Sequence, residues 1–557
     1  ALKVRLGMAR WTAKRTARLA YDHMQQFLNI EHGGMLEMLL NLYEETGDKE
    51  FLDTATRFEH KRIFDPLLGR DDSILLHLHG NSTVPKILGA TRAYELLGEP
   101  RYRQLSEFFW DAVVKTRSYV TGNSTNREHW GHRSKLADEL SVSTTESCVA
   151  HNMMKLTGRM FQWEPRASLM DYYERTMFGH ILATQHPESG ATMWYLPLAS
   201  GYWKWYASYI HLCCTGTLNE SFATFGENVY YHNPSSLYVT QFVASELSWP
   251  EKGLTLIQET DFPESGAMTF TFKLDKPVDL QLMLRYPGWA TAGGSLTLNG
   301  EQQAFPNRPG SFHAIKRQWQ NGDTLQVQFS MPLRAWPMPD DSNQIAFLAG
   351  PVVLAGRLGT AGLTPEMIDG SVNPHDYRPI DAPSLTSLVG EEVSQSVSKG
   401  SSSPREPPAD ASDYQSRSFN LVTGLLTPVA GKSLSWRIGG QGRDIELVPL
   451  YRLHGERYAV YWKSQSEDDL ADKEDKEIPA ASIYRTKLPT NGRVDLRTRG
   501  DLPASMNLAG KNLIDCLDPD YGYRPRRAIN LIRPVSYTHL RAHETDSYLV
   551  CRLLLEK

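Results

Sequence analysis

Apolar side chains recur every three to four residues over about the first 225 positions, which is the period of an amphipathic helix. One such run extends from Met35 to Tyr43, and after Thr46-Gly47-Asp48 a second helix is predicted from near Glu50. The same arrangement returns around Gly98-Glu99-Pro100 and around Trp163-Glu164-Pro165. Glycine ends one helix and proline begins the next. We therefore expect helical hairpins, repeated at roughly 50 to 65 residues, that bury one another's apolar faces.

From about Ser236 the apolar period changes to two, which is the period of a half-buried strand. Short strands at this density, separated by glycine, proline and asparagine, predict a β-sandwich that ends near Leu358. The segments that alternate begin at Leu237, Leu254, Met268, Leu280 and Leu325. Strand-like segments resume with Leu447 to Tyr451 and Tyr458 to Trp462. Between the two groups, Ser401 to Pro408 is a linker or loop by composition, and the acidic run near Glu467 to Glu477 is interpreted as a solvated loop.

The two periods together predict a multidomain α plus β protein, in which an N-terminally truncated (α/α)6 helical toroid is followed by β-sandwich domains. Three or four hairpins are visible where six would close a toroid, and the chain opens without methionine, so we expect its front end to be missing. From about Val535 the chain resembles a translated sequencing-adaptor tail, and we leave its histidines and cysteine out of the site. The predicted parts are a catalytic toroid over 1–225, a β-sandwich over 226–360, a Pro/Ser-rich linker or long loop over 361–415, an accessory β-rich domain over 416–534 and the tail over 535–557.

Composition and charge exclude several classes of protein. A hydrophobic content of 41% and an aromatic content of 10% are typical of a folded protein. A net charge of −5, with acids and bases spread along the chain, gives no reason to expect nucleic acid as a partner. No apolar run approaches the roughly 20 residues of a membrane span. No signal peptide is visible, so the compartment is left open between periplasmic or secreted and cytoplasmic, and so is the oligomeric state.

Three of the five cysteines fall in two short segments, Thr145-Glu146-Ser147-Cys148 and His211-Leu212-Cys213-Cys214. Thiolate is a soft ligand and carboxylate a workable fourth, so the glutamate and these three cysteines could close a tetrahedral zinc site. The alternative is that they are buried small apolar residues, since free cysteines often are. The spacing lacks the CxxC of common structural zinc modules, so on spacing alone both interpretations stay open.

Several other segments hold polar residues among apolar ones, and each alone is more often structural than functional. They are His79 to Pro85, a loop from Tyr119 to Trp130, a helical Asp171 to Arg175 and an aromatic cluster from Trp194 to Tyr206. Taken together and in this order with the cysteine segments, they resemble the zinc-dependent β-L-arabinofuranosidases of glycoside hydrolase families 127 and 146. The resemblance extends from about Glu31 to about Tyr461, and its most specific part is the Glu-x-Cys segment combined with Cys-Cys.

This resemblance implies retaining hydrolysis that releases terminal β-L-arabinofuranose from plant glycans. Most retaining glycosidases use two carboxylates about 5 Å apart, whereas in this family a zinc-bound cysteine takes the place of the nucleophile. A free thiol has a pKa of about 8.5, and zinc would hold it as thiolate. The matching residues are Cys213 as nucleophile, Glu128 as general acid/base, Glu146, Cys148 and Cys214 as the remaining zinc ligands, and His79, Glu174, His211 and, more weakly, Tyr195 as contacts to the sugar.

Two other functions stay open at this point. One keeps the fold but places a different sugar in the pocket, or assigns the fold an epimerase-like activity. A glutamate and a metal thiolate suit an epimerase poorly. The other is a non-catalytic carbohydrate-binding protein with structural zinc. Structural zinc sites have four protein ligands, as this one would. The ligand count therefore does not separate a glycosidase from a binding protein with structural zinc.

Overall fold

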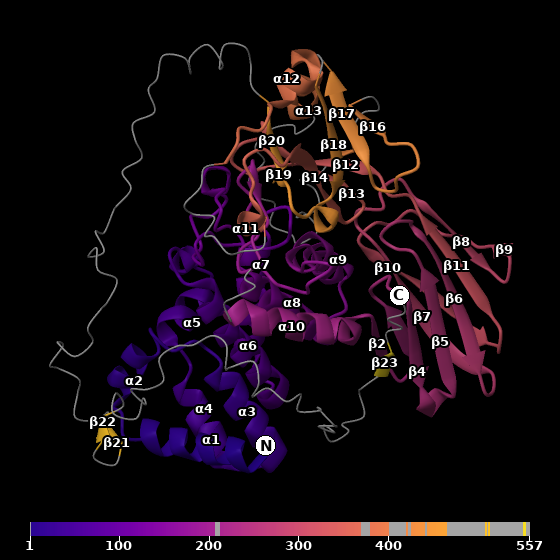
Figure 1. Cartoon of the computed structure of the whole chain (residues 1–557). Helices are drawn as coiled ribbons and strands as arrows, with labels where there is room; N and C mark the ends of the chain where they lie inside the picture. Colours follow the sequence, from indigo (N-terminus) through magenta and orange to yellow (C-terminus); the bar gives the residue numbers. More distant parts are fainter. Residues whose placement is uncertain are drawn as a thin grey trace, which may run out of the picture. The chain divides into compact units, whose positions relative to one another are not determined.

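The computed structural model describes residues 2–206, 212–368, 379–399, 425–440 and 443–464, together with short strands at 419–420, 507–508, 511–512 and 550–552. It divides into two compact units, one formed by residues 1–467 and 549–557 and the other by residues 468–548. In the second unit, the described residues form the two-stranded pair β21 (Asn507–Leu508) and β22 (Lys511–Asn512). The first unit, shown in Figure 1, contains everything considered below.

Helices form the first part of the chain, as the period of the apolar residues predicts (Figure 1). The backbone at Gly47 and Gly98 is left-handed, with φ of 68° and 69°, and each glycine ends a helix. Pro100 begins the helix after the second glycine. The longer helices of this part are α1 (Leu2–Thr16), α2 (Tyr21–Phe27), α3 (Met35–Thr46), α4 (Lys49–Arg57), α5 (Lys61–Leu68), α6 (Gly80–Leu97), α7 (Pro100–Val114), α8 (Ser147–Trp163), α9 (Ala167–Thr176) and α10 (Cys213–Thr224).

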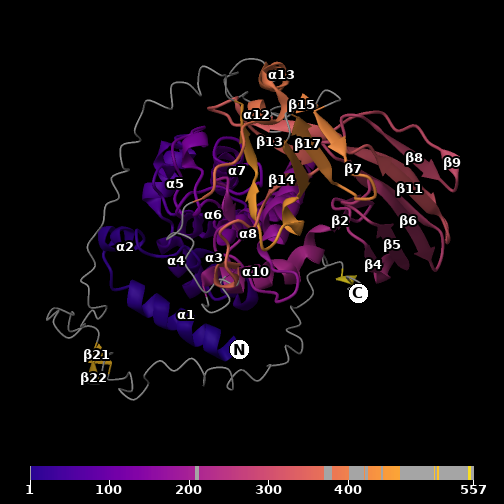
Figure 2. The same ribbon diagram turned by 45° about the horizontal axis from the view of Figure 1, so that its top comes forward.

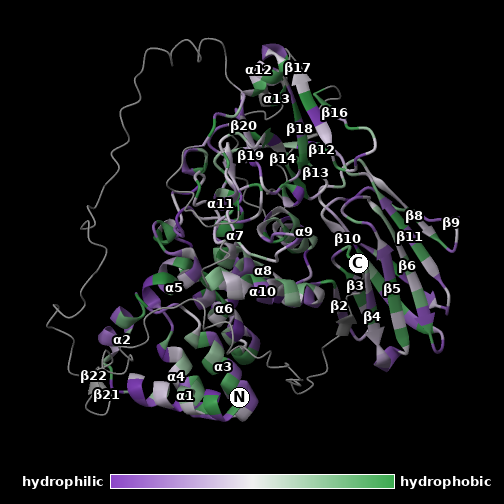
Figure 3. Ribbon diagram, in the orientation of Figure 1, coloured by the Kyte–Doolittle hydropathy of each residue, from purple (hydrophilic) through white to green (hydrophobic). Residues whose placement is uncertain are grey.

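Two antiparallel-rich sheets follow and form a β-sandwich, as predicted. Their inner faces share one core, in which Phe272 of β6 stacks on Trp319 of β10 with ring centroids 3.9 Å apart. Apolar and polar residues alternate along β5 and β6, so that one face of the sheet is buried (Figure 3). One sheet has the order β10-β7-β3-β2 and the other β23-β4-β5-β6-β11-β8-β9. Their bounds are β2 (Tyr230–Asn233), β3 (Ser236–Val239), β4 (Ser245–Trp249), β5 (Leu254–Thr260), β6 (Ala267–Leu274), β7 (Val278–Tyr286), β8 (Gly294–Leu298), β9 (Glu301–Gln302), β10 (Ser311–Trp319), β11 (Thr324–Phe329) and β23 (Val550–Arg552).

A further sheet joins residues 333–359 to strands from beyond residue 418, with the path β15-β12-β13-β14-β18-β17-β16 and with β1, β19 and β20 attached to it. The period-two pattern placed 333–359 with the sandwich, because alternation identifies a strand without identifying its partner. The bounds are β1 (Tyr202–Trp203), β12 (Leu333–Pro337), β13 (Gln344–Ala349), β14 (Val352–Gly359), β15 (Phe419–Asn420), β16 (Leu426–Pro428), β17 (Trp436–Gly440), β18 (Arg443–Pro449), β19 (Arg457–Ala459) and β20 (Tyr461–Lys463).

This sheet is buried on both faces along β13 and β14. Ala346 and Leu348 belong to the core of the helical part, whereas Ile345 and Phe347 face a separate core on the other side. Figure 2 shows the sheet beside the helices from a second direction. The second core is completed by α12 (Leu385–Val389), with α13 (Glu391–Lys399) beside it.

Part of the segment predicted as a linker or long loop is therefore helical, since α11 (Pro365–Ile368), α12 and α13 all fall within it. Leu385 and Leu388 are fully buried and fix α12 on the sheet. The predicted loop from Ser401 to Pro408 and the acidic run from Glu467 to Glu477 lie outside the described residues, as does most of the predicted tail. Of the helices that are described, none combines the length and the apolar character needed to cross a membrane.

Candidate metal centre and active site

Two helix N-termini bring the three cysteines of the candidate site to one point. Cys148 lies in the first turn of α8, and Cys213 and Cys214 are the first two residues of α10, which packs against α8 (Figure 1). The N-terminus of a helix carries a partial positive charge, which favours a thiolate over a thiol. The fold therefore places sulfur where its ionised form is stabilised.

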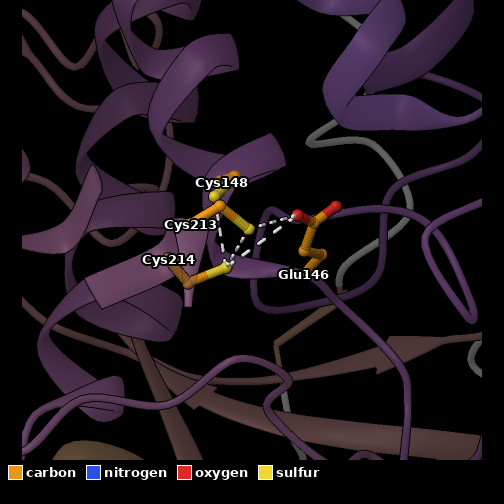
Figure 4. A group of neighbouring side chains, drawn as sticks. All are labelled: Glu146, Cys148, Cys213 and Cys214. Atoms are coloured by element: carbon orange, nitrogen blue, oxygen red, sulfur yellow. Dashed lines mark hydrogen bonds between the residues drawn. The ribbon is translucent and has the colours of Figure 1, made fainter. Parts of the chain in front are cut away.

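Four side chains converge there within a small volume. The Sγ atoms of Cys148 and Cys214 are 3.2 Å apart, and Oε1 of Glu146 lies 3.9 Å from the sulfurs of both Cys213 and Cys214 (Figure 4). All four ligand atoms lie within 4.8 Å of one another. A sulfur separation of 3.2 Å is too long for a disulfide, in which the bond is about 2.05 Å. The structure thus brings together the four residues that the sequence suggested as metal ligands.

The chemistry of the four donors is that of a cation site. Glu146 is fully buried, its Oε2 has no hydrogen-bond partner, and burial raises the pKa of its carboxyl to about 9. The hydrogen bonds from Cys148 and Cys214 lower the pKa of the Cys213 thiol far below its usual range, whereas the same contacts raise the pKa of Cys148 and Cys214. Three sulfurs and a carboxylate cannot all be ionised together without positive charge among them, so the donor set fits a soft divalent cation such as zinc.

Exposure separates the three cysteines. Cys148 and Cys214 are each 1% exposed, while Cys213 is exposed to solvent. Figure 4 shows the carboxylate of Glu146 turned toward the sulfurs, and it makes no capping bond to α8 although it precedes that helix. Cys213 is therefore the sulfur that a molecule entering from outside could reach.

Glu128 lies beside this group, held at both carboxylate oxygens. His79 Nε2 is 3.1 Å from Oε2, and the indole Nε1–H of Trp194 donates to Oε1 at 3.0 Å. The ligand atoms of His79, Glu128 and Glu146 also lie within 4.8 Å of one another, so Glu146 belongs to both groups. The hydrogen bond from His79 is the main cause that lowers the pKa of Glu128, with a smaller contribution from Trp194. The exposed sulfur of Cys213 and the carboxylate of Glu128 thus flank the same buried glutamate.

The loop that carries Glu128 has an unusual backbone. Thr125, Arg127 and Glu128 have φ of 82°, 49° and 68°, a left-handed conformation that costs a side-chain-bearing residue of order 1 kcal/mol or more. Hydrogen bonds from Gly80 N to Glu128 O at 2.7 Å and from Arg127 N to Ser143 O at 3.0 Å hold it. Backbone strain at several neighbouring positions around a candidate catalytic carboxylate is typical of functional loops.

His79 has a fixed orientation because it caps α6. The backbone N–H of Ser82 donates to His79 Nδ1 at 3.2 Å, so Nδ1 is the acceptor and Nε2 carries the hydrogen that points at Glu128. The side chain that caps this helix is that of His79.

Tyr195 lies in the wall of the site. Its backbone forms an antiparallel bridge with Glu146, and nearby Glu128 and Glu146 contribute to raising the pKa of its hydroxyl, for which burial is the main cause. Trp194 stacks on Tyr195 with ring centroids 4.6 Å apart. The sequence alone does not distinguish Trp194 from a core residue, which is what a tryptophan in an aromatic cluster most often is.

One of the residues that the resemblance suggested as sugar contacts, Glu174, is not part of this group. Both oxygens of Glu174 bind elsewhere, one to the guanidinium of Arg285 at 2.5 Å and one to the indole of Trp289 at 2.7 Å, and the residue is fully buried. His211 lies outside the described residues. A sugar contact by either remains a prediction.

Comparison with known proteins gives a consistent result along the chain. Residues 1–227 match the glycoside hydrolase family 127 β-L-arabinofuranosidase catalytic domain, and residues 236–331 match the middle domain of the same family. A curated protein of Bifidobacterium longum, the non-reducing end β-L-arabinofuranosidase, is 23% identical over 294 residues. That match covers 48% of this chain and 43% of the relative, so the chain spans less than half the length of the curated protein it resembles.

Solved structures share the fold. A family 127 β-arabinofuranosidase has a TM-score of 0.57 at 20% identity, over 77% of this chain and 68% of that one. A family 127 β-L-arabinofuranosidase from Geobacillus stearothermophilus T6 has a TM-score of 0.53 at 17% identity, over 77% and 72%. The α plus β architecture predicted from the sequence agrees with these structures.

Proposed function

Because the chain belongs to glycoside hydrolase family 127, we propose that it is a retaining exo-glycosidase that releases terminal β-L-arabinofuranose from plant glycans. The observation that carries the proposal is the position of Glu146, whose carboxylate lies within 4.8 Å both of the exposed sulfur of Cys213 and of the carboxylate of Glu128. A nucleophile and an acid/base on either side of one small volume are what a double displacement requires.

The metal of this proposal is zinc, bound by Glu146, Cys148, Cys213 and Cys214. The buried, unpartnered Oε2 of Glu146 and the three clustered sulfurs support this donor set. Zinc, when bound, supplies the positive charge that holds several cysteine sulfurs as thiolates close together. The remaining chemistry belongs to side chains of the chain itself.

In the first step, the thiolate of Cys213 attacks the anomeric carbon of the arabinofuranose. A carbon–sulfur bond forms as the bond from that carbon to the leaving oxygen breaks, and Glu128 gives its proton to this oxygen. In the second step, water attacks the same carbon while Glu128 takes a proton from it, and the sulfur leaves again as thiolate. Two inversions at one carbon give net retention of configuration.

The two N–H contacts of Glu128 favour its carboxylate form, which is the form that takes a proton from water in the second step. Each carboxylate oxygen accepts one N–H and keeps a second lone pair, which is available to carry the proton that moves to or from the substrate. His79, whose Nε2–H is directed into the site, and Tyr195 are the described residues that we propose to contact the furanose hydroxyls. The proposal that His211 and Glu174 also contact the sugar rests on the resemblance alone.

The test is release of L-arabinose from an aryl β-L-arabinofuranoside by the 557-residue chain, with zinc measured on the same sample. About one zinc per chain together with release of arabinose as its β-anomer, followed by NMR at early times, is the expected result. Zinc without release would move the proposal to a different sugar or to a non-catalytic carbohydrate-binding role. Release with inversion would remove Cys213 as nucleophile.

A further inference from the structure

We propose that Trp194 is a positioning residue. Its indole N–H holds the carboxylate of Glu128 in a fixed position relative to α8, the helix that begins next to Glu146 and carries Cys148. The inference rests on the proposed role of Glu128 as acid/base. It concerns a residue whose indole N–H binds Glu128 and which acts through that carboxylate.

The carboxylate of Glu128 needs an external restraint. Its side chain is 22% exposed and is attached to a backbone in the left-handed conformation. A glutamate side chain retains several rotatable bonds, and ordering such a side chain costs up to about 2 kcal/mol. One hydrogen bond to one oxygen would still let the carboxylate plane turn about that contact. Two donors on different oxygens, Nε2 of His79 and Nε1 of Trp194, remove this rotation.

The second restraint is itself anchored at the metal-binding helix. The backbone N–H of Ser147, the first residue of α8, donates to the carbonyl of Trp194 at 3.0 Å, and its hydroxyl donates to the carbonyl of Met193 at 3.0 Å. The next residue, Tyr195, forms the bridge to Glu146 and stacks on the indole of Trp194. Residues 193–195 are therefore tied to residues 146–147, and the indole transmits that position to Glu128. His79 holds the other oxygen from α6 and has no such tie to α8 in these contacts.

The two donors thus position Glu128 relative to two different elements. His79 sets its position relative to α6, and Trp194 sets it relative to Glu146 and Cys148. Since the proton on Glu128 and the sulfur of Cys213 must meet the same glycosidic bond, the restraint from the α8 side is the one that fixes their separation.

The experiment compares Trp194→Phe with Trp163→Phe in the full chain, using aryl β-L-arabinofuranosides that span a range of leaving-group pKa. Phenylalanine keeps an aromatic ring beside Tyr195 and deletes the N–H together with part of the ring volume, a loss of volume that Trp163→Phe shares. Trp163 is a matched control because its indole N–H has no hydrogen-bond partner among the residues that the structure describes. We expect W194F to lose roughly 10- to 100-fold in kcat for poor leaving groups, the effect of a lost hydrogen bond to a charged group, and only a few-fold for activated ones. KM should change little, and W163F should follow the wild type throughout.

An equal loss on every substrate would overturn the proposal, since a general loss of structure does not depend on the leaving group. Unchanged kinetics in W194F would overturn it as well. Crystal structures of both variants give a readout that needs no turnover: the carboxylate of Glu128 should lose its defined position in W194F and keep it in W163F. A fixed carboxylate in W194F contradicts the role of Trp194, whereas a wild type that releases no arabinose contradicts only the proposed function.

Discussion

The guanidinium of Arg285 and the carboxylate of Glu174 form an ion pair at 2.5 Å in which neither side chain reaches solvent. The pair joins α9 of the helical part to β7 of the sandwich, and Asp171 completes it by binding the same guanidinium. Further bonds run from Arg285 Nε to Thr240 O at 2.6 Å and from Trp289 to Glu174. A buried, hydrogen-bonded charge network therefore links the helical part of the chain to the sandwich.

Removing the guanidinium of Arg285 should strongly destabilise the protein. Arg285→Met leaves two buried carboxylates without their counter-charge, and we expect the free energy of unfolding to fall by about 3 to 5 kcal/mol. Urea denaturation followed by circular dichroism measures this. The control is Arg437→Met, which removes an exposed pair with Asp444 and should change stability by no more than about 0.5 kcal/mol. If the two variants unfold with the same free energy, the network contributes nothing to stability.

Cys213 and Cys148 should respond differently to the same substitution. Cys213→Ser replaces the proposed nucleophile, which is also a proposed zinc ligand, so turnover should fall roughly a thousandfold or more even in molecules that keep zinc. Cys148→Ser removes a buried ligand, so zinc content should fall together with thermal stability. Zinc analysis, melting temperature and arabinose release on both variants separate the two roles. A C213S variant that keeps wild-type turnover would rule out the sulfur as nucleophile.

Metal binding should release the proton of Glu146. With a pKa raised to about 9 by burial in the metal-free chain, this carboxyl is protonated at pH 7 and must lose its proton to act as a ligand. Glu146→Gln should therefore bind zinc more weakly and release about one proton fewer, while the metal-free variant keeps nearly the wild-type stability. Calorimetry in buffers of different ionisation enthalpy counts the protons. Identical proton release by E146Q and wild type would mean that Glu146 is not a ligand.

His60 should make the protein less stable as the solution becomes acidic. Its ring is 3% exposed with Nε2 unpartnered, and burial, with the charges of Lys86 and Arg62, lowers its pKa from about 6.5 to about 4. The unfolded chain therefore takes up a proton at a higher pH than the folded one. The stabilising effect of a neutral His60 is complete above pH 6.5 and is lost, by about 3 kcal/mol at most, as the pH falls to about 4.

Denaturation of His60→Gln across this pH range checks the sign. The variant should lose less stability on acidification than the wild type, and His23→Gln, at an exposed histidine of α2, should match the wild type. A wild-type slope in H60Q would show that other groups are responsible.

The periodic parts of the fold were predictable because local patterns determine them. Gly47 and Gly98 end helices and Pro100 begins one, as the sequence indicated, and the strands from Leu254 and Met268 begin at or next to those positions. The pairing of β13 and β14 with strands beyond residue 440 was not predictable, since alternation carries no information on partners.

The candidate site was predictable only in part, for a related reason. Rare residue types at unusual spacing mark Glu146 and the cysteines, and the resemblance adds Glu128 and His79. The proposed role of Trp194 was not predictable, because it depends on one hydrogen bond to a residue 66 positions away. Glu174 was expected to face a sugar, and nothing in its own segment indicates Arg285, 111 residues further along.

The contact between Cys148 and Cys214 closes a span of 66 residues, and this has a consequence for how the protein folds. Bringing such distant positions together costs conformational entropy before any ligand bond is formed. A zinc ion held by all four proposed donors would therefore find them together only in a chain whose α8 and α10 have formed and docked. Zinc content would then report the correct assembly of these two helices, and misassembled chains would stay without metal.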